Sequence, residues 1–223
     1  MQKWVYLFLY PNRMFLYNVR DRNCTTLPNN SGNVYIPRWY VFCESLYNER
    51  MEYIVFVNED GTPTGEIGPK LESHTDSTKL HLAFSCYVFN DNNELLVTRR
   101  ADTKKVWPGV WTNSVCGHPG PDEAITDAIA RRLHEELGMT ADDVKVVLPT
   151  YTYQTPPYNG IIEHEFCPVY VAKATSDVHP NPDEVAEYRW MTWDDYIAET
   201  AADTADVWSW WCKDQLKQLK DKI

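Results

Sequence analysis

The distribution of apolar and polar residues divides the chain from residue 51 onward into short predicted elements. Residues 51–57 are β-rich and run into a turn at 58–61, which is typical of a strand. Residues 81–89 and 94–100 are also β-rich and flank the turn at 90–93, so the pair predicts a hairpin.

A helical period is clearest over residues 122–137, where apolar side chains recur at steps of three and four from Ala124 to Leu133. Pro121 precedes this stretch and Gly138 follows it, as expected for the two ends of a helix. The other expected elements are a long polar loop at 62–79, strands at 144–153, 161–172 and 187–193, and helices at 194–200 and 206–223. Strands on both sides of a central helix predict a mixed α/β (α+β) fold.

The first fifty residues differ from the rest, because they show no clean period and carry six Lys/Arg against three Asp/Glu. We therefore expect residues 1–50 to be an N-terminal extension and residues 51–223 to be the functional domain. The alternative is that the first fifty residues form a small structured subdomain of their own.

Net charge, hydropathy and cysteine content restrict the binding partners and the cellular compartment that we expect. The net charge of −11 argues against binding to nucleic acid or to an anionic membrane. No apolar run reaches the length of a transmembrane helix. Six scattered cysteines without a CxxC pair indicate reduced thiols. We expect a cytoplasmic protein with a small-molecule substrate, without nucleic-acid or membrane partners, and a monomer or weak homodimer.

Candidate chemistry concentrates around the predicted helix. Cys116 and His118 lie just before it, and Glu135 and Glu136 lie near its end, where two carboxylates can hold Mg²⁺. The spacing from Gly117 through the helix resembles the Nudix box, a loop–helix–loop that binds a metal–diphosphate unit. A solvated, charged helix face would explain the spacing alone equally well.

Further possible ligands lie outside the helix. His74, His81 and His118 could join Glu163 and Glu165, whose spacing of two places them on one face of a strand. Two carboxylates on one face of an apolar strand favour a bound cation. Such a mixed nitrogen and oxygen set suits Zn²⁺, Mn²⁺ or Mg²⁺. The remaining histidines are assigned to surface or core: His134, His164 and His179.

Four separate stretches together resemble type I isopentenyl-diphosphate Δ-isomerase, in matching order and spacing: residues 74–85, 96–100, 105–119 and 163–169. The resemblance covers about residues 51–212 and excludes residues 1–50. It implies a Nudix-like mixed sheet sandwiched between helices. It also implies conversion of isopentenyl diphosphate to dimethylallyl diphosphate, by protonation and deprotonation through a tertiary carbocation.

The resemblance also implies roles for matching residues. One divalent metal, Zn²⁺, Mn²⁺ or Mg²⁺, would have five ligands: His74, His81, His118, Glu163 and Glu165. Cys116 and Glu165 would be the acid and base on opposite faces of the substrate, with Tyr153 beside the glutamate. Cys116 is expected in a loop near cations, where the thiol could reach either protonation state.

For a second set of residues, the resemblance implies a role in binding the substrate. Glu136 would hold an Mg²⁺ that bridges to the diphosphate. The phosphates would pair with four cations: Lys70, Arg100, Lys104 and Arg132. Trp211 would cover the hydrocarbon, although Trp208 and Trp210 compete for that role.

Two alternatives remain on sequence grounds: a Nudix pyrophosphohydrolase and a non-catalytic Nudix-like binding module. Nudix hydrolases have Glu at the position of Arg132, which argues against hydrolysis. The presence of both Cys116 and Glu165 argues against a binding module.

Overall fold

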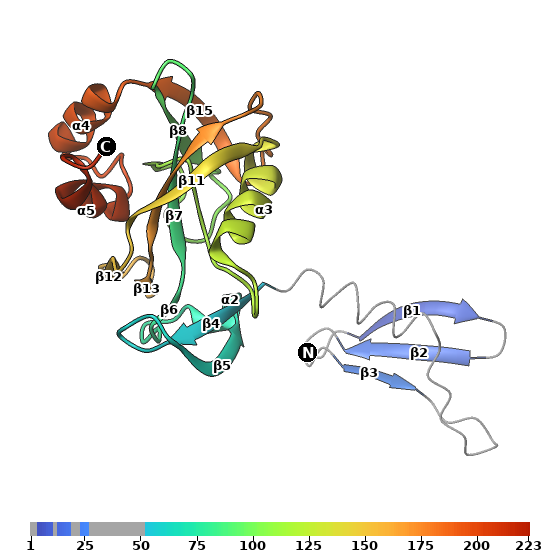
Figure 1. Cartoon of the computed structure of the whole chain (residues 1–223). Coiled ribbons are helices and arrows are strands. Elements are labelled where there is room, and N and C mark those ends of the chain that lie inside the picture. Colours follow the sequence, from blue (N-terminus) through green and yellow to red (C-terminus); the bar gives the residue numbers. More distant parts are fainter. Residues whose placement is uncertain (1–3, 11–12, 19–22, 27–51) are drawn as a thin grey trace. The chain divides into compact units, whose positions relative to one another are not determined.

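The computed structural model describes residues 4–10, 13–18, 23–26 and 52–223. Contacts divide the chain into two units, Met1–Arg50 and Met51–Ile223. The first unit contains an antiparallel sheet of β1 (Trp4–Tyr10), β2 (Arg13–Asn18) and β3 (Asn23–Thr26), in that order (Figure 1). The sequence predicted no element in this segment, so these strands were missed. No helix in the described part of the chain is long and apolar enough to span a bilayer.

The second unit is built on two sheets. The larger has the strand order β11-β14-β7-β8-β15, with β10 paired to β7 and β9 paired to β8. Its strands are β7 (Phe84–Phe89), β8 (Leu95–Arg100), β9 (Trp111–Thr112), β10 (Val115–Gly117), β11 (Ala141–Leu148), β14 (Val169–Ala174) and β15 (Val185–Met191). The predicted hairpin is confirmed, since β7 and β8 pair antiparallel.

The smaller sheet has the order β12-β13-β6-β4-β5. Its strands are β4 (Tyr53–Val57), β5 (Pro63–Pro69), β6 (His81–Leu82), β12 (Thr152–Gln154) and β13 (His164–Phe166). The helices are α2 (Lys70–Ser73), α3 (Ile125–Leu137), α4 (Trp193–Ala202) and α5 (Trp210–Leu219).

Both faces of the larger sheet are covered. Figure 1 shows α3 on one side of β7 and β8, and α4 with α5 on the other. Along β7, Phe84 and Val88 are buried in the core formed with α3, while Tyr87 is buried in the core formed with α4 and α5. This period-two division is the reason that β7 is apolar on both faces. The predicted mixed sheet sandwiched between helices is confirmed.

The predicted helix over residues 122–137 begins three residues later than expected. Asp122 adopts a left-handed backbone conformation with φ of 61°, which cannot continue into a helix. The predicted end is confirmed, because Gly138 has φ of 55° and its N–H donates to the carbonyl of His134. The last helix likewise begins at Trp210, where the Ser209 side chain accepts from the N–H of Cys212.

Other sequence boundaries were wrong. The expected loop at 62–79 contains β5 and α2; β5 is mostly exposed and polar, so it lacks the pattern of a half-buried strand. Three expected strands each break into two: 81–89 into β6 and β7, 144–153 into β11 and β12, and 161–172 into β13 and β14. In each case one piece belongs to the smaller sheet and the other to the larger. The candidate site lies where these segments pass from one sheet to the other.

Candidate active site

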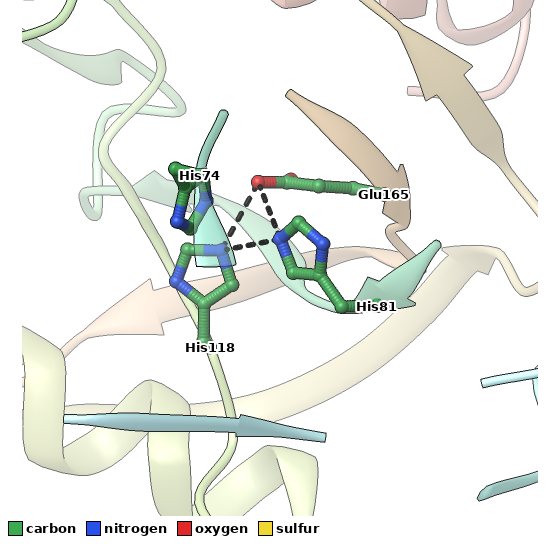
Figure 2. Close-up of side chains that lie close together, drawn as sticks. All are labelled: His74, His81, His118 and Glu165. Atoms are coloured by element: carbon green, nitrogen blue, oxygen red, sulfur yellow. Dashed lines mark hydrogen bonds and ion pairs between the residues drawn. The ribbon is translucent and has the colours of Figure 1, made fainter. Parts of the chain in front are cut away.

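Four predicted ligands converge at one point: His74, His81, His118 and Glu165. Their ligand atoms all lie within 4.8 Å of one another (Figure 2). The Nε2 atom of His118 is 3.1 Å from Oε1 of Glu165 and 3.3 Å from Nε2 of His81. His81 and Glu165 are directly opposed because β6 and β13 pair in parallel, with these two residues in register.

Main-chain carbonyl groups orient the imidazoles of His74 and His81. Nδ1 of His74 lies 2.7 Å from the carbonyl of Lys70, and Nδ1 of His81 lies 2.9 Å from the carbonyl of Lys79. Because a carbonyl only accepts, each Nδ1 carries a proton, and Nε2 of each ring is the atom left to bind a metal. Carbonyl support of this kind is typical of metal-binding histidines.

The local environment favours the protonation states that bind metals. Burial lowers the pKa of His118 to about 3 and also lowers the pKa of His74. Burial alone would raise the pKa of Glu165, but the nearby imidazoles of His118 and His81, whose Nε2 atoms lie 3.1 Å and 3.7 Å from Oε1, outweigh it and hold the pKa well below its usual value. Lowered pKa values at His74 and His118 beside a carboxyl group with a lowered pKa fit a divalent cation.

Tyr153 connects this group to a second carboxylate. Its hydroxyl donates to Oε2 of Glu165 at 2.7 Å and lies 3.4 Å from Oε2 of Glu163. Glu163 precedes β13 and lies outside the four-residue group. Burial, and secondly the charge of Glu165, raise the pKa of Glu163. The structure thus places the two glutamates beside one hydroxyl but brings only Glu165 to the imidazoles.

The environment of Cys116 differs from the expected loop. Cys116 lies in strand β10, opposite Ser85 of β7. Its Sγ donates to Oδ1 of Asn113 at 3.1 Å and lies 3.3 Å from Oγ of Ser85. Burial is the main cause that raises the pKa of the thiol. Burial therefore favours the neutral thiol, whereas the sequence led us to expect a thiol that could reach either protonation state.

Cys116 opens into a small pocket that it shares with Arg100, Glu136, Trp211 and Glu184. Trp211 is fixed there because its Nε1 donates to Oγ1 of Thr112 at 2.8 Å. Arg100 faces the Trp211 ring at 5.8 Å and donates to the carbonyls of residues 106 and 107.

The other two tryptophans lie elsewhere. Trp208 packs against Tyr196 at 5.2 Å, and Trp210 packs against Tyr153 at 5.8 Å. Of the three competing tryptophans, Trp211 is the one that lines the pocket with the thiol.

The other three predicted phosphate-binding cations are all paired with carboxylates. Lys70 pairs with Glu52 at 2.5 Å, and Lys104 pairs with Glu184. Arg132 contacts both of these glutamates and also Glu135 and Glu136. Sequence reasoning missed Glu52 and Glu184, because neither belongs to a recognisable motif and an isolated acidic residue usually indicates only solvated surface.

The Nudix-like spacing has a structural role as well. Glu123 accepts from Nε of Arg131 at 2.7 Å and from the N–H of Gly120 at 2.7 Å. Nη2 of Arg131 donates to the carbonyl of His118 at 3.2 Å. The Arg131–Glu123 ion pair, together with the hydrogen bond from Arg131 to His118, attaches the loop that contains His118 to helix α3.

Comparison with known proteins agrees with this arrangement. The NUDIX domain family matches residues 79–211. A protein named isopentenyl-diphosphate Delta-isomerase from Saccharopolyspora erythraea is 47% identical over 169 residues, which cover 76% of this chain and 86% of that protein. A protein of the same name from Paenarthrobacter aurescens is 49% identical over 168 residues, covering 75% and 90% of the two chains.

A crystal structure of a Deinococcus radiodurans protein has the same fold, with a TM-score of 0.58 at 18% identity, covering 75% of this chain and 98% of that one. The extent and identity of the sequence matches confirm the resemblance found in the sequence. The chain therefore belongs to the isopentenyl-diphosphate Delta-isomerase family and carries a NUDIX domain.

Proposed function

We propose that the protein converts isopentenyl diphosphate to dimethylallyl diphosphate. The observation that carries this proposal is the placement of two groups suited to proton transfer: Cys116, whose thiol lines a pocket with Trp211, and Glu165, which lies among three imidazoles and accepts from Tyr153. Burial raises the pKa of the thiol, whereas His118 and His81 lower that of the carboxyl group, so the two groups differ in the direction of their shifts. Family membership supplies the substrate, since relatives bear the name of this isomerase.

The reaction requires such a pair. The substrate has an unactivated alkene, so a proton must be added to its terminal CH₂ carbon and another removed from C2. No carbonyl is present to store charge in the cationic intermediate, so acid and base must both be positioned in a site protected from water. Together, Cys116 and Glu165 hold one proton before turnover and one proton after it, which allows the reaction to run in either direction.

The roles of neighbouring residues follow from their contacts. Tyr153 orients Glu165 through its 2.7 Å hydrogen bond. Asn113 and Ser85 hold Sγ of Cys116 in place. Trp211 provides an aromatic face beside the thiol, and such a face stabilises a nearby cation without offering a lone pair that the cation could alkylate.

A divalent metal fits the group of His74, His81, His118 and Glu165, because the Nε2 atoms of His81 and His118 lie 3.3 Å apart and both face Oε1 of Glu165. The ion would be Zn²⁺, Mn²⁺ or Mg²⁺. When bound, it supplies positive charge beside Glu165, which tunes the acidity of that carboxyl group. We retain Glu163 as a proposed fifth ligand, since its carboxylate lies beside the same Tyr153 hydroxyl as Glu165.

The diphosphate would bind near the pocket that Cys116 shares with Arg100 and Glu136. We propose Glu136 as ligand of a second ion, Mg²⁺, because this partly buried carboxylate shares the pocket with the thiol. The cations that would contact the phosphates are Lys70, Arg100, Lys104 and Arg132.

One assay tests the function. The protein is incubated with isopentenyl diphosphate and Mg²⁺ in deuterated water, and the products are analysed by NMR and mass spectrometry. Dimethylallyl diphosphate containing deuterium is the expected product. Release of phosphate would instead indicate a hydrolase, and recovery of unchanged substrate would indicate a binding module.

A further inference from the structure

Every nitrogen of the Arg132 guanidinium contacts at least one carboxylate of the described part of the chain. Nε donates to Oε1 of Glu136 at 2.9 Å. One terminal nitrogen donates to Glu52 at 3.0 Å and to Glu135 at 3.1 Å. The other is 2.7 Å from Glu136 and 3.2 Å from Glu184. Since a guanidinium has five N–H donors, Arg132 can bind a phosphate only after a carboxylate withdraws.

Glu52 lies between two of the proposed phosphate-binding cations. One of its oxygens is 2.5 Å from Nζ of Lys70, and the other is 3.0 Å from Arg132. Burial would raise the pKa of Glu52, but the charges of Lys70 and Arg132 outweigh it and lower the pKa to about 2. Glu52 is therefore an anion at neutral pH, at a point where an anionic ligand would make the same two contacts.

Of the two carboxylates that connect Arg132 to a lysine, Glu52 is the freer to move. Its side chain is 43% exposed, against 24% for Glu184. A half-exposed carboxylate can turn into solvent and recover hydration, so its displacement costs less than that of the more buried Glu184.

We propose that Glu52 is a displaceable place-holder whose carboxylate occupies the position between Lys70 and Arg132 that a phosphoryl group of the substrate takes. The identity of the ligand as a diphosphate rests on the proposed function. The position of the place-holder rests only on these contacts.

Both cations are held in place by other contacts when Glu52 turns away. Lys70 is fixed by its main chain, because its N–H donates to the carbonyl of Glu52 at 2.8 Å. Arg132 projects from helix α3 and retains its contacts with Glu135, Glu136 and Glu184. Loss of the Glu52 carboxylate therefore exposes a preformed anion site, and its side chain is not needed as a support.

The test measures the Kd of inorganic pyrophosphate with Mg²⁺ by calorimetry for the full chain and three variants. Glu52→Gln removes the charge and is expected to bind about three- to tenfold more tightly than the unsubstituted protein. Glu52→Asp keeps the charge but is one methylene shorter, so it cannot reach both cations and is expected to bind with intermediate affinity. Glu66→Gln is the matched control, because Glu66 on strand β5 forms an exposed ion pair with Lys79 and contacts neither Lys70 nor Arg132 in the described part of the chain. Its Kd is expected to remain unchanged.

Equal or weaker binding by Glu52→Gln would overturn the proposal and make Glu52 a structural support. Tighter binding by Glu52→Gln with an unchanged Glu52→Asp would also overturn it, because net charge alone would then explain the gain. For the isomerase reaction, Glu52→Gln is expected to lower KM and leave kcat unchanged. Pyrophosphate contains no alkene, so the binding result stands or fails separately from the isomerase assay.

Discussion

The hydroxyl of Tyr153 donates a 2.7 Å hydrogen bond to Oε2 of Glu165, while Oε1 of the same carboxylate faces His118 at 3.1 Å. The two oxygens thus have different partners: Oε1 faces the imidazoles and Oε2 faces Tyr153. Burial, and secondly the charge of Glu165, raise the pKa of Tyr153 well above its usual value. Its hydroxyl is therefore protonated at neutral pH and can donate to the carboxylate.

Tyr153→Phe should lower kcat by roughly a hundredfold, because Glu165 loses the group that orients its reacting oxygen. Metal content, measured by plasma mass spectrometry, should not change, since the imidazoles still hold Oε1. The matched control is Tyr151→Phe, because Tyr151 stacks on Tyr153 at 5.7 Å but donates to Asp214. A Tyr153→Phe protein with unchanged kcat would remove Tyr153 from its proposed role.

The sequence predicted the residue types of the site better than their arrangement. Motif spacing brought forward His74, His81, His118 and Glu165, which the structure places within 4.8 Å of one another. Their proximity depends on the parallel pairing of β6 with β13, two segments more than eighty residues apart, and no local pattern encodes such pairing. Hydrophobic period also continues across Ala83, where the chain leaves one sheet and enters the other, so it could not reveal the break.

The place-holder carboxylate shows a different limit. Glu52 precedes a short strand and would be read as solvated in any sequence. Its importance comes from Lys70 and Arg132, which reach it from two separate helices. Ion pairs between distant segments are set by tertiary packing and leave no trace in a single sequence.

His74→Ala should weaken binding of the divalent metal by at least roughly a hundredfold, because a direct ligand is removed. The measurement is competition against a chelator of known affinity. His134→Ala is the control, since His134 is exposed on helix α3 outside the group. Because burial lowers the pKa of both His74 and His118, protons should compete for these imidazoles, and binding should weaken, only below the usual imidazole pKa of about 6.5. Equal metal affinity in the two variants would exclude His74 as a ligand.

Cys116→Ala should reduce kcat by roughly three orders of magnitude while fold and metal content persist. The thiol contacts Asn113 and Ser85 but does not belong to the His/Glu group, so its loss leaves the metal ligands intact. Cys167→Ala provides the control, because Cys167 is a buried thiol 3.5 Å from the same Ser85 hydroxyl. Substantial turnover by Cys116→Ala would show that another group exchanges the proton.

We propose that residues 51–223 form the complete isomerase domain, and we expect deletion of residues 1–50 to leave kcat and KM unchanged. The boundary between the two units falls between residues 50 and 51 of the sequence, and the family match at residues 79–211 lies within the second unit. The shortened protein should start at Met51, so that Glu52 and strand β4 are retained. A truncated protein that keeps its circular dichroism spectrum but loses turnover would show that the first fifty residues contribute to catalysis.

Asp203→Asn should lower the free energy of unfolding by about 2 kcal/mol at pH 7, because one buried carboxylate organises the turn that leads to Trp211. Its side chain is 3% exposed and accepts from the N–H groups of Ala205, Val207 and Trp208 and from Lys213. Burial would raise the pKa of Asp203, but these donors outweigh it and hold the pKa below its usual value. A depressed pKa in the folded state contributes stability that is complete above the unfolded pKa of about 3.9 and is lost as the pH falls through the folded value. Urea titrations should therefore show the difference between the unsubstituted protein and Asp203→Asn shrinking below pH 4.

The control for this prediction is Asp206→Asn. It removes a carboxylate that pairs with the same Lys213 but is 85% exposed, so its effect should stay within about 0.5 kcal/mol. Equal destabilisation by the two variants would mean that the Lys213 ion pair, and not the backbone hydrogen bonds, accounts for the stability.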